Sequence, residues 1–420
     1  MHAWSAAQVP ALPPSQNPDL DPRVRVWDTA SGSLRAVGPE QGTAGMYVCG
    51  ITPYDATHLG HAFTYLTFDL LYRAWLDAGL EVDYVQNITD VDDPLLERAA
   101  ATGQDWEELA ADQIELFRTD MAMLRVLPPL HYVAVTETID LVQDTVARLR
   151  DEQLVYQLAD DEHPDWYFRC TRVPHFGAIS HLSREQMLAE FAAKGGDPER
   201  PGKKDALDSL VWQVERPEEP AWESAALGHG RPGWHIECTA IAQKYLGTTF
   251  AVQGGGRDLA FPHHEMSAAV GRGVTNGARF AQAYVHVGMV GLHGEKMSKS
   301  LGNLELVSRL RGQQVPGPVI RLALLAHHYR TDWEWFPTDL EAAQRRADAW
   351  AAAFQAPQGP PAAPVVDGLR AALRNDLNAA RALAEVDEWS SAVLAGDGAD
   401  TQSPGQVADA VDALLGVRFD

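Results

Sequence analysis

The sequence contains few lysines and few cysteines. Only six of its 420 residues are lysines, and acidic side chains outnumber basic ones by 58 to 34, so the formal net charge is −24. A surface this negative repels polyanions, which excludes a general nucleic-acid-binding protein. The three cysteines are too few, and odd in number, for a disulfide scaffold.

Long apolar runs are also missing. No stretch of about 18 consecutive apolar residues occurs, which argues against a membrane span. The first 22 residues have neither a basic start nor an apolar centre, so no signal peptide is predicted. These features indicate a soluble protein of the cytoplasm. The length allows a large buried core and about two or three domains.

One stretch in the first quarter of the chain has the pattern of a βαβ unit. Residues 45–51 (GMYVCGI) predict a short buried strand, and residues 81–89 predict a second one. Between them, apolar residues recur at helical spacing over residues 61–78, and Gly79 is a plausible helix stop. A strand, a helix and a second strand in this order predict a parallel βαβ unit.

The rest of the chain predicts a nucleotide-binding sheet that is interrupted by an insertion. Helical patterns dominate residues 92–155, WYFRC (166–170) is a candidate strand, and strand-like patterns return at 249–256 and 283–292. The predicted fold class is α/β, with a Rossmann-type catalytic domain and a short C-terminal helical region. The predicted units are a loose N-terminal arm (1–22), the first half of the catalytic domain (23–120), an inserted connective region (121–225), the second half of the catalytic domain (226–305), a helical stem (306–354), a linker (355–366) and a remnant of two short helices (367–420).

His58 and His61 frame Leu59-Gly60 where the predicted helix begins. The loop between a first strand and its helix is where α/β folds bind nucleotides, because a helix N-terminus favours negative charge. Imidazole N–H groups at this point could donate to phosphate oxygens, and Gly60 would let the base of ATP approach the backbone. The alternative is that one histidine caps the helix and the other lies on the surface.

Lys296 and Lys299 lie in GEKMSKSLGN (294–303) and are two of only six lysines in an acidic chain. Two ammonium groups on one short segment suit the charge that develops as pyrophosphate leaves ATP. A pair of lysines alone would otherwise indicate a solvated loop.

Cys49, Cys238 and His263 form a third candidate group. Thiolate and imidazole are preferred zinc ligands, although only the fold could bring these distant residues together. The alternatives are two buried thiols and a surface histidine.

HLGH and KMSKS together resemble the "HIGH" and "KMSKS" signatures of class I aminoacyl-tRNA synthetases, with leucine in place of isoleucine in the first. The stretches CGITPYDATHLGHA, YVQNITDVDDPLLERA, HYVAVTETI and GGGRDLAFPHHE are similar to the mycothiol-pathway ligases that join L-cysteine to glucosaminyl-inositol. These ligases are a sister family of the cysteinyl-tRNA synthetases, and the resemblance covers roughly residues 23–340. One departure is AKGGDP at 193–198, where the ligases commonly read ERGGDP.

The resemblance implies an ATP-dependent enzyme that forms cysteinyl-adenylate, with magnesium accompanying ATP, and that transfers cysteine to the sugar amine. It implies one zinc, held by Cys49, Cys238 and His263, that recognises the thiolate of the substrate cysteine. The fourth ligand of the synthetases, a glutamate, is replaced by Ser267, while Glu265 fits that spacing poorly. The implied catalytic residues are His58, His61, Lys296 and Lys299. The implied substrate-binding residues are Cys49, Gly50, Ile51, Thr52, Thr64, Asn87, Ile88, Thr89, Trp234, Gly256, Arg257, Asp258 and Val290, although Trp234 also fits an ordinary core aromatic.

The C-terminal residues 341–420 contain no lysine, six arginines and twelve acidic side chains. Gripping a tRNA anticodon stem requires a basic track, so this segment predicts an enzyme that acts on small molecules and binds no tRNA. A monomer is expected, although the sequence does not reveal the oligomeric state. A truncated cysteinyl-tRNA synthetase is the second hypothesis. A non-catalytic, zinc-dependent paralogue that binds a nucleotide or cysteine is the third. The residues do not reveal the base of the second step or the contacts of the inositol.

Overall fold

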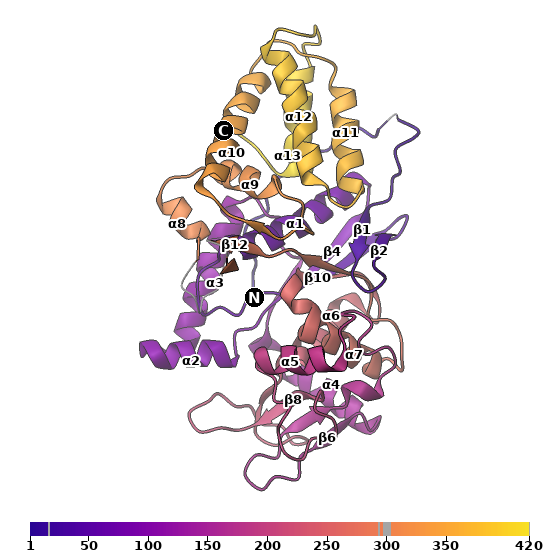
Figure 1. Cartoon of the computed structure of the whole chain (residues 1–420), viewed down its shortest axis with the longest axis vertical. Coiled ribbons are helices and arrows are strands. Elements are labelled where there is room, and N and C mark those ends of the chain that lie inside the picture. Colours follow the sequence, from indigo (N-terminus) through magenta and orange to yellow (C-terminus); the bar gives the residue numbers. More distant parts are fainter. Residues whose placement is uncertain (16, 293–294, 297–303, 420) are drawn as a thin grey trace.

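The structure is a computed structural model that describes residues 1–15, 17–292 and 304–419, and the backbone of 295–296. A five-stranded parallel sheet in the order β11-β10-β3-β4-β5 lies at its centre. Figure 1 shows this sheet in the middle of an elongated molecule, with the C-terminal helices at one end and an inserted region at the other. The strands are β3 (Thr43–Val48), β4 (Glu81–Ile88), β5 (His131–Ala134), β10 (Phe250–Gly256) and β11 (Ala281–Val287).

Both faces of the sheet are buried, and successive side chains at β3 pack on opposite faces. Met46 and Val48 belong to the core that contains α1 (Leu59–Asp77). Tyr47 and Cys49 belong to the core that contains α6 (Trp234–Leu246) and α7 (Glu265–Val274). This alternation follows from the two-residue period of a strand, and it turns the side chain of Cys49 toward α6.

The predicted βαβ unit is confirmed. The predicted strands at 45–51 and 81–89 correspond to β3 and β4, which pair in parallel, and the predicted helix at 61–78 corresponds to α1. The chain leaves α1 through Gly79, whose φ of 81° favours glycine.

The inserted region contains an antiparallel sheet in the order β6-β7-β8-β9, of which only the strand at WYFRC was predicted. Both predicted bounds of this region differ from the structure. The first half of the catalytic domain extends beyond residue 120, because β5 lies within 121–225 and pairs with β4. The inserted sheet extends beyond residue 225, because β9 (Gly230–Pro232) pairs with β8. The other α-helices and strands between β4 and β9 are α2 (Asp93–Thr102), α3 (Trp106–Met123), α4 (Ile139–Asp151), β6 (Val155–Gln157), β7 (Trp166–Phe168), α5 (Arg184–Ala193) and β8 (Ser209–Val214).

Within residues 355–419 the structure has three helices, where the sequence predicts two. The first of them begins at Ala362, inside the predicted linker, because Pro364 falls in its first turn, where proline is tolerated. The helices that follow the catalytic domain are α8 (Val307–Gly312), α9 (Gly317–Leu325), α10 (Pro337–Phe354), α11 (Ala362–Arg374), α12 (Ala379–Leu394) and α13 (Ser403–Leu415).

Smaller elements complete the described part of the chain. They are β1 (Arg25–Asp28), β2 (Ser33–Ala36), β12 (Val290–Leu292), β13 (Glu295–Lys296), β14 (Trp333–Glu334), the 3-10 helices at Val135–Thr138, Cys170–Arg172 and Arg257–Leu259, and a π-helical turn at Ala260–His264. None of the helices in the described ranges is both long and apolar enough to cross a membrane.

A buried ionic group attaches α13 to the catalytic domain. On α1, Asp69 accepts a hydrogen bond from Arg73 at 2.8 Å, and it is also paired with Arg321 on α9. Arg73 donates to the carbonyl of Asp412 at 2.9 Å, and Arg321 donates to that of Leu415 at 2.5 Å. Burial opposes ionisation of Asp69, but the two guanidinium charges hold its pKa below the usual value. Two arginines therefore satisfy carbonyl groups at the end of α13.

The N-terminal arm is not loose, although its described residues form no helix or strand. Trp4 is 7% exposed and packs edge-on against Phe117 and Tyr132. Its indole N–H donates to the carbonyl of Val126 at 2.7 Å. Burial of this large aromatic side chain orders the arm, although the Pro- and Ala-rich composition predicts disorder.

Trp4→Phe should lower the free energy of unfolding by about 1 kcal/mol, because phenylalanine keeps most of the apolar contact but loses the indole hydrogen bond. Urea unfolding at equilibrium measures the change. Ser5→Ala, at the exposed neighbouring position, is the control and should change it little. An unchanged stability in Trp4→Phe would show that this hydrogen bond does not hold the arm.

Candidate active site and metal centre

A cavity of about 340 Å³ lies at the carboxyl ends of the central strands, beside the first turn of α1. Ligands of open α/β sheets bind at this edge. Eleven residues named from the sequence line it, namely Cys49, Gly50, Ile51, Thr52, His58, His61, Thr64, Trp234, Gly256, Asp258 and Val290. Reasoning from the sequence missed Tyr54, Tyr65, Leu259, Gly288 and Met289, which also line it. Tyr65 could have been found from the sequence, since it follows His61 by one turn of the predicted helix and so lies on the same face.

Four named residues do not line this cavity: Asn87, Ile88, Thr89 and Arg257. The buried amide of Asn87 instead accepts hydrogen bonds from the Tyr47 hydroxyl and from the backbone N–H of Gly50, both at 2.9 Å. A Cβ atom at Gly50 would lie 1.6 Å from the carbonyl oxygen of Asn87, so only glycine fits there. Asn87 therefore lies behind the lining residue Gly50 and holds the backbone of Gly50 in place.

Arg257 points to another partner. Its guanidinium pairs with both carboxylate oxygens of Asp332 at 2.8 Å, and Asp332 also accepts from the backbone N–H of Met289 at 2.7 Å. Met289 lines the cavity, so Arg257 is linked to the lining of the site through Asp332 and does not contribute to the lining itself.

The two histidines of the HLGH loop lie together at the cavity. Their rings stack with centroids 3.8 Å apart. The Nδ1 atom of His58 accepts from the backbone N–H of Gly60 at 3.1 Å and of His61 at 3.4 Å, so His58 is the N-cap of α1. Helix capping was the predicted alternative to phosphate binding by a histidine, but one imidazole ring can do both. An accepting Nδ1 places the proton on Nε2, which remains a donor.

The backbone on either side of the KMSKS motif lies beside this cavity. Lys296, in β13, pairs with Gly291 of β12, next to the cavity-lining Val290. After the motif, the carbonyl of Glu305 accepts from the backbone N–H of Leu59 in the HLGH loop at 2.9 Å. The side chain of Lys296 and the whole of Lys299 lie outside the described residues. Their roles therefore stay predictions.

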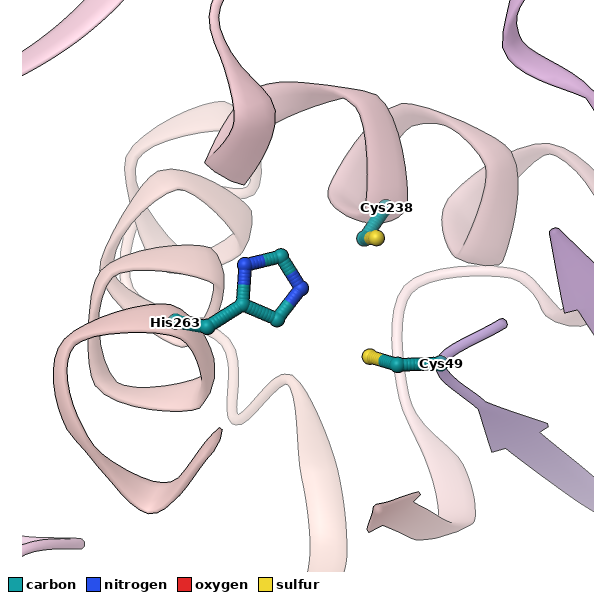
Figure 2. Close-up of side chains that lie close together, drawn as sticks. All are labelled: Cys49, Cys238 and His263. Carbon is teal, nitrogen blue, oxygen red and sulfur yellow. The ribbon is translucent and has the colours of Figure 1, made fainter. Parts of the chain in front are cut away.

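Cys49, Cys238 and His263 form one buried group, as Figure 2 shows. Their ligand atoms all lie within 4.8 Å of one another. Cys49 follows β3, Cys238 is on α6, and His263 is in the turn before α7, so three separate elements meet here. The Nε2 atom of His263 is buried and has no hydrogen-bond partner among the described residues. Two thiols and one orphaned imidazole nitrogen fit zinc, with a coordination position left for a further ligand.

The two thiols share one negative charge. Burial raises the pKa of Cys49 well above its usual value, and the hydrogen bond with Cys238 adds to this. Burial also opposes ionisation of Cys238, but the hydrogen bond with Cys49 and the nearby imidazole of His263 lower its pKa well below the usual value. The group therefore already favours a thiolate, which is the form that binds a metal.

Neutral histidines surround this group. His264 Nε2 lies 3.2 Å from the sulfur of Cys49, and its Nδ1 lies 2.8 Å from Nε2 of His286. His235 Nδ1 lies 3.0 Å from Nδ1 of His263. Burial lowers the pKa of all three of these outer histidines, that of His286 to about 3. Neutral imidazoles of this kind orient metal ligands. In the sequence, the second histidine of FPHHE was the signal of His264.

Ser267 and Glu265 lie outside the group. The Ser267 hydroxyl donates to the carbonyl of His235 at 3.2 Å. The carboxylate of Glu265 accepts from the backbone N–H groups of Gly177, Ile179 and Ser180 at 2.9–3.0 Å, so it anchors a loop of the inserted region.

Comparison with known proteins identifies the class of this fold and site. Residues 36–345 match the family model for "tRNA synthetases class I (C) catalytic domain". The chain therefore has the catalytic domain of a class I synthetase.

Curated relatives narrow this class. The chain is 56% identical to the L-cysteine:1D-myo-inositol 2-amino-2-deoxy-alpha-D-glucopyranoside ligase of Nocardiopsis dassonvillei, over all of both chains. It is also 56% identical to the ligase of the same name from Thermomonospora curvata and 54% identical to that of Streptomyces coelicolor, again over the full length of both chains. The chain belongs to this ligase family.

Solved structures agree on the fold. A Mycobacterium tuberculosis methionyl-tRNA synthetase in complex with methionyl-adenylate aligns with a TM-score of 0.59 and 15% identity, over 89% of each chain. A leucyl-tRNA synthetase from Agrobacterium radiobacter K84, solved in a ternary complex, aligns with a TM-score of 0.65 and 11% identity, over 90% of this chain and 84% of that one. The expected α/β class I synthetase fold is confirmed.

Proposed function

We propose that this protein is the ATP-dependent ligase that joins L-cysteine, through cysteinyl-adenylate, to the amine of glucosaminyl-inositol in mycothiol biosynthesis. The observation that carries the proposal is the position of Cys49, Cys238 and His263. They form a thiol-selective metal group, and Cys49 also lines the cavity at the HLGH loop. An amino acid held by its sulfur at this point has its carboxylate in the same cavity as the nucleotide.

In the first step, the carboxylate of cysteine attacks the α-phosphate of ATP and pyrophosphate leaves. The imidazoles of His58 and His61 lie at the helix N-terminus, where negative charge is favoured. Lys296 and Lys299 neutralise the charge that develops on the departing pyrophosphate, which magnesium accompanies. Thr52, Thr64, Gly256 and the backbone at Val290 hold the adenylate.

In the second step, the sugar amine attacks the carbonyl carbon of the adenylate. The bond from this carbon to the AMP oxygen breaks, AMP leaves, and the amine nitrogen loses a proton as the amide forms. Asp258 lines the cavity and is an exposed carboxylate, so it can accept that proton. Trp234 stacks on His263 with ring centroids 4.2 Å apart, and thereby separates the metal group from solvent.

Zinc, when bound, supplies a soft Lewis acid that takes the substrate as a thiolate and so disfavours serine, whose hydroxyl is a harder and less acidic ligand. The chain contributes two sulfurs and one imidazole, and the neutral histidines behind them fix the directions of these ligands. We further propose that the enzyme works as a monomer in the cytoplasm, where free thiols such as its three cysteines are kept reduced.

The C-terminal helices argue against a tRNA acceptor. Five of the six arginines in residues 341–420 are paired with carboxylates, and the segment carries twelve acidic side chains. These arginines are Arg346, Arg370, Arg374, Arg381 and Arg418. Paired cations have little capacity to neutralise phosphates, so the helices lack the basic track that a tRNA stem requires.

We expect the purified protein, given ATP and cysteine, to form an amide with glucosaminyl-inositol and to leave cysteine-specific tRNA uncharged. Mass spectrometry identifies the products. The amide rate should rise with pH toward the pKa of the sugar amine, because only the unprotonated amine attacks. Efficient charging of tRNA without amide formation would favour a truncated cysteinyl-tRNA synthetase. Absence of pyrophosphate release with cysteine would favour a non-catalytic paralogue.

A further inference from the structure

A second and larger cavity, of about 730 Å³, adjoins the first. The two cavities share the lining residues Thr52, Tyr54, Trp234, Asp258 and Leu259. From this junction the second cavity extends toward the start of α2, the strands β8 and β9, and the loop that follows α5. A molecule held in it would reach the first cavity at the shared residues. It therefore has the position required of the second substrate.

The lining of the second cavity is strongly polar, and most of its charges are already paired. Ion pairs join Arg231 to Asp93, Arg216 to Asp165 at 2.7 Å, and Lys203 to the lining residue Asp197 at 2.9 Å. Three lining carboxylates have no cationic partner among the described residues. These are Asp92, Glu97 and Asp258.

The three remaining carboxylates define what this cavity would accept. Ionised carboxylates act only as acceptors, so they suit a ligand rich in hydroxyl and amine donors. An anionic or apolar ligand would leave them unpaired at a cost. Asp258 lines both cavities and so lies at their junction, whereas Asp92 lines only the second cavity.

We propose that the second cavity is the acceptor site, and that Asp92 accepts hydrogen bonds from hydroxyl groups of the polyhydroxylated amino-sugar. This inference rests on the proposed function. In it, the amine lies at the junction next to Asp258, and the remainder of the acceptor fills the space lined by Asp92 and Glu97. The cavity thereby selects a neutral or cationic polyol and disfavours a phosphorylated one.

Asp92 allows a clean test, because its other role can be preserved. It is the N-cap of α2, and its carboxylate accepts from the backbone N–H of Asp93 at 2.9 Å. Serine is about as good an N-cap as aspartate, so Asp92→Ser keeps the start of the helix while its short hydroxyl withdraws from the cavity. Asp92→Asn keeps both the length and one acceptor oxygen. Asp112, exposed on α3 and outside both cavities, offers Asp112→Ser as a control that removes the same charge.

Two readouts separate the two steps for each variant. Isotope exchange between pyrophosphate and ATP, with cysteine alone, reports adenylate formation. Amide formation at varied glucosaminyl-inositol reports the acceptor. We expect Asp92→Ser to keep the exchange rate and to raise KM for the acceptor roughly 10- to 100-fold, as for loss of a hydrogen bond to a charged group. Asp92→Asn should show a smaller rise, and Asp112→Ser none.

The outcomes also separate this inference from the proposed function. No amide from the wild-type protein, with exchange intact, would overturn the proposed function and this inference with it. Amide from the wild type together with an unchanged acceptor KM in Asp92→Ser would overturn this inference alone. Equal losses of exchange and amide formation in Asp92→Ser would also overturn it, since Asp92 would then support the whole site.

Discussion

We expect the wild-type protein to bind one zinc per chain and Cys238→Ala to lose nearly all of it. Cys238 is one of only three protein ligands that the structure brings within 4.8 Å of one another, and it is the thiol whose surroundings favour ionisation. Two remaining ligands cannot complete a site that already has one position open for the substrate. Metal analysis after gel filtration gives the stoichiometry directly.

Cys170→Ala is the matched control for this measurement. Cys170 is also a buried free thiol, but its sulfur lies 3.3 Å from the hydroxyl of Ser209, in the inserted region and outside the metal group. The control should keep one zinc per chain. Full zinc content in Cys238→Ala would show that the metal, if any, is held elsewhere.

Lys296→Ala should slow adenylate formation by roughly a hundred- to a thousandfold, with cysteine binding little changed. The removed ammonium acts on charge that exists only as pyrophosphate leaves, and loss of one such contact typically costs about 2.7–4 kcal/mol in the transition state. Exchange between pyrophosphate and ATP measures the rate, and calorimetric titration with cysteine measures the binding.

Lys244→Ala is the control for the lost charge, because Lys244 is an exposed lysine in the last turn of α6. It should exchange pyrophosphate at the wild-type rate. If Lys296→Ala also activates cysteine at that rate, the role assigned to the KMSKS lysine is wrong.

The central βαβ unit could be predicted because its signals are local. The period of the apolar residues and the stop at Gly79 determine β3, α1 and β4 to within three residues at each end. The inserted antiparallel sheet could not be predicted, since β6, β7 and β9 are only three residues long and gain their stability from pairing with distant strands. The firm attachment of the N-terminal arm comes from contacts across the fold, such as those of Trp4 with Phe117, Tyr132 and Val126, and these have no local pattern.

The candidate site likewise contains residues that could be predicted from the sequence and residues that could not. Cys49, Cys238 and His263 could be named because residue chemistry and family resemblance agreed on them, and the fold does bring them together. Asn87 was named as a pocket residue, yet it lies beneath the backbone of Gly50, which a motif cannot reveal. The second cavity was not predicted as a site, because its lining comes from α2, the inserted region and the start of α6, although AKGGDP (193–198) contributes part of it. Residue roles at both cavities stay predictions until the variants are measured.

The ionic group on Asp69 has a consequence for how the molecule unfolds. Arg73 and Arg321 serve the catalytic domain and the last helix at once, because each bonds Asp69 on α1 and a carbonyl at the end of α13. Separation of α13 would leave two buried guanidinium groups short of acceptors, a state that costs several kcal/mol. The C-terminal helices and the helix that presents His58 and His61 therefore form a single cooperative unit. In this chain, the end that would grip tRNA in a synthetase instead contributes to the rigidity of the nucleotide site.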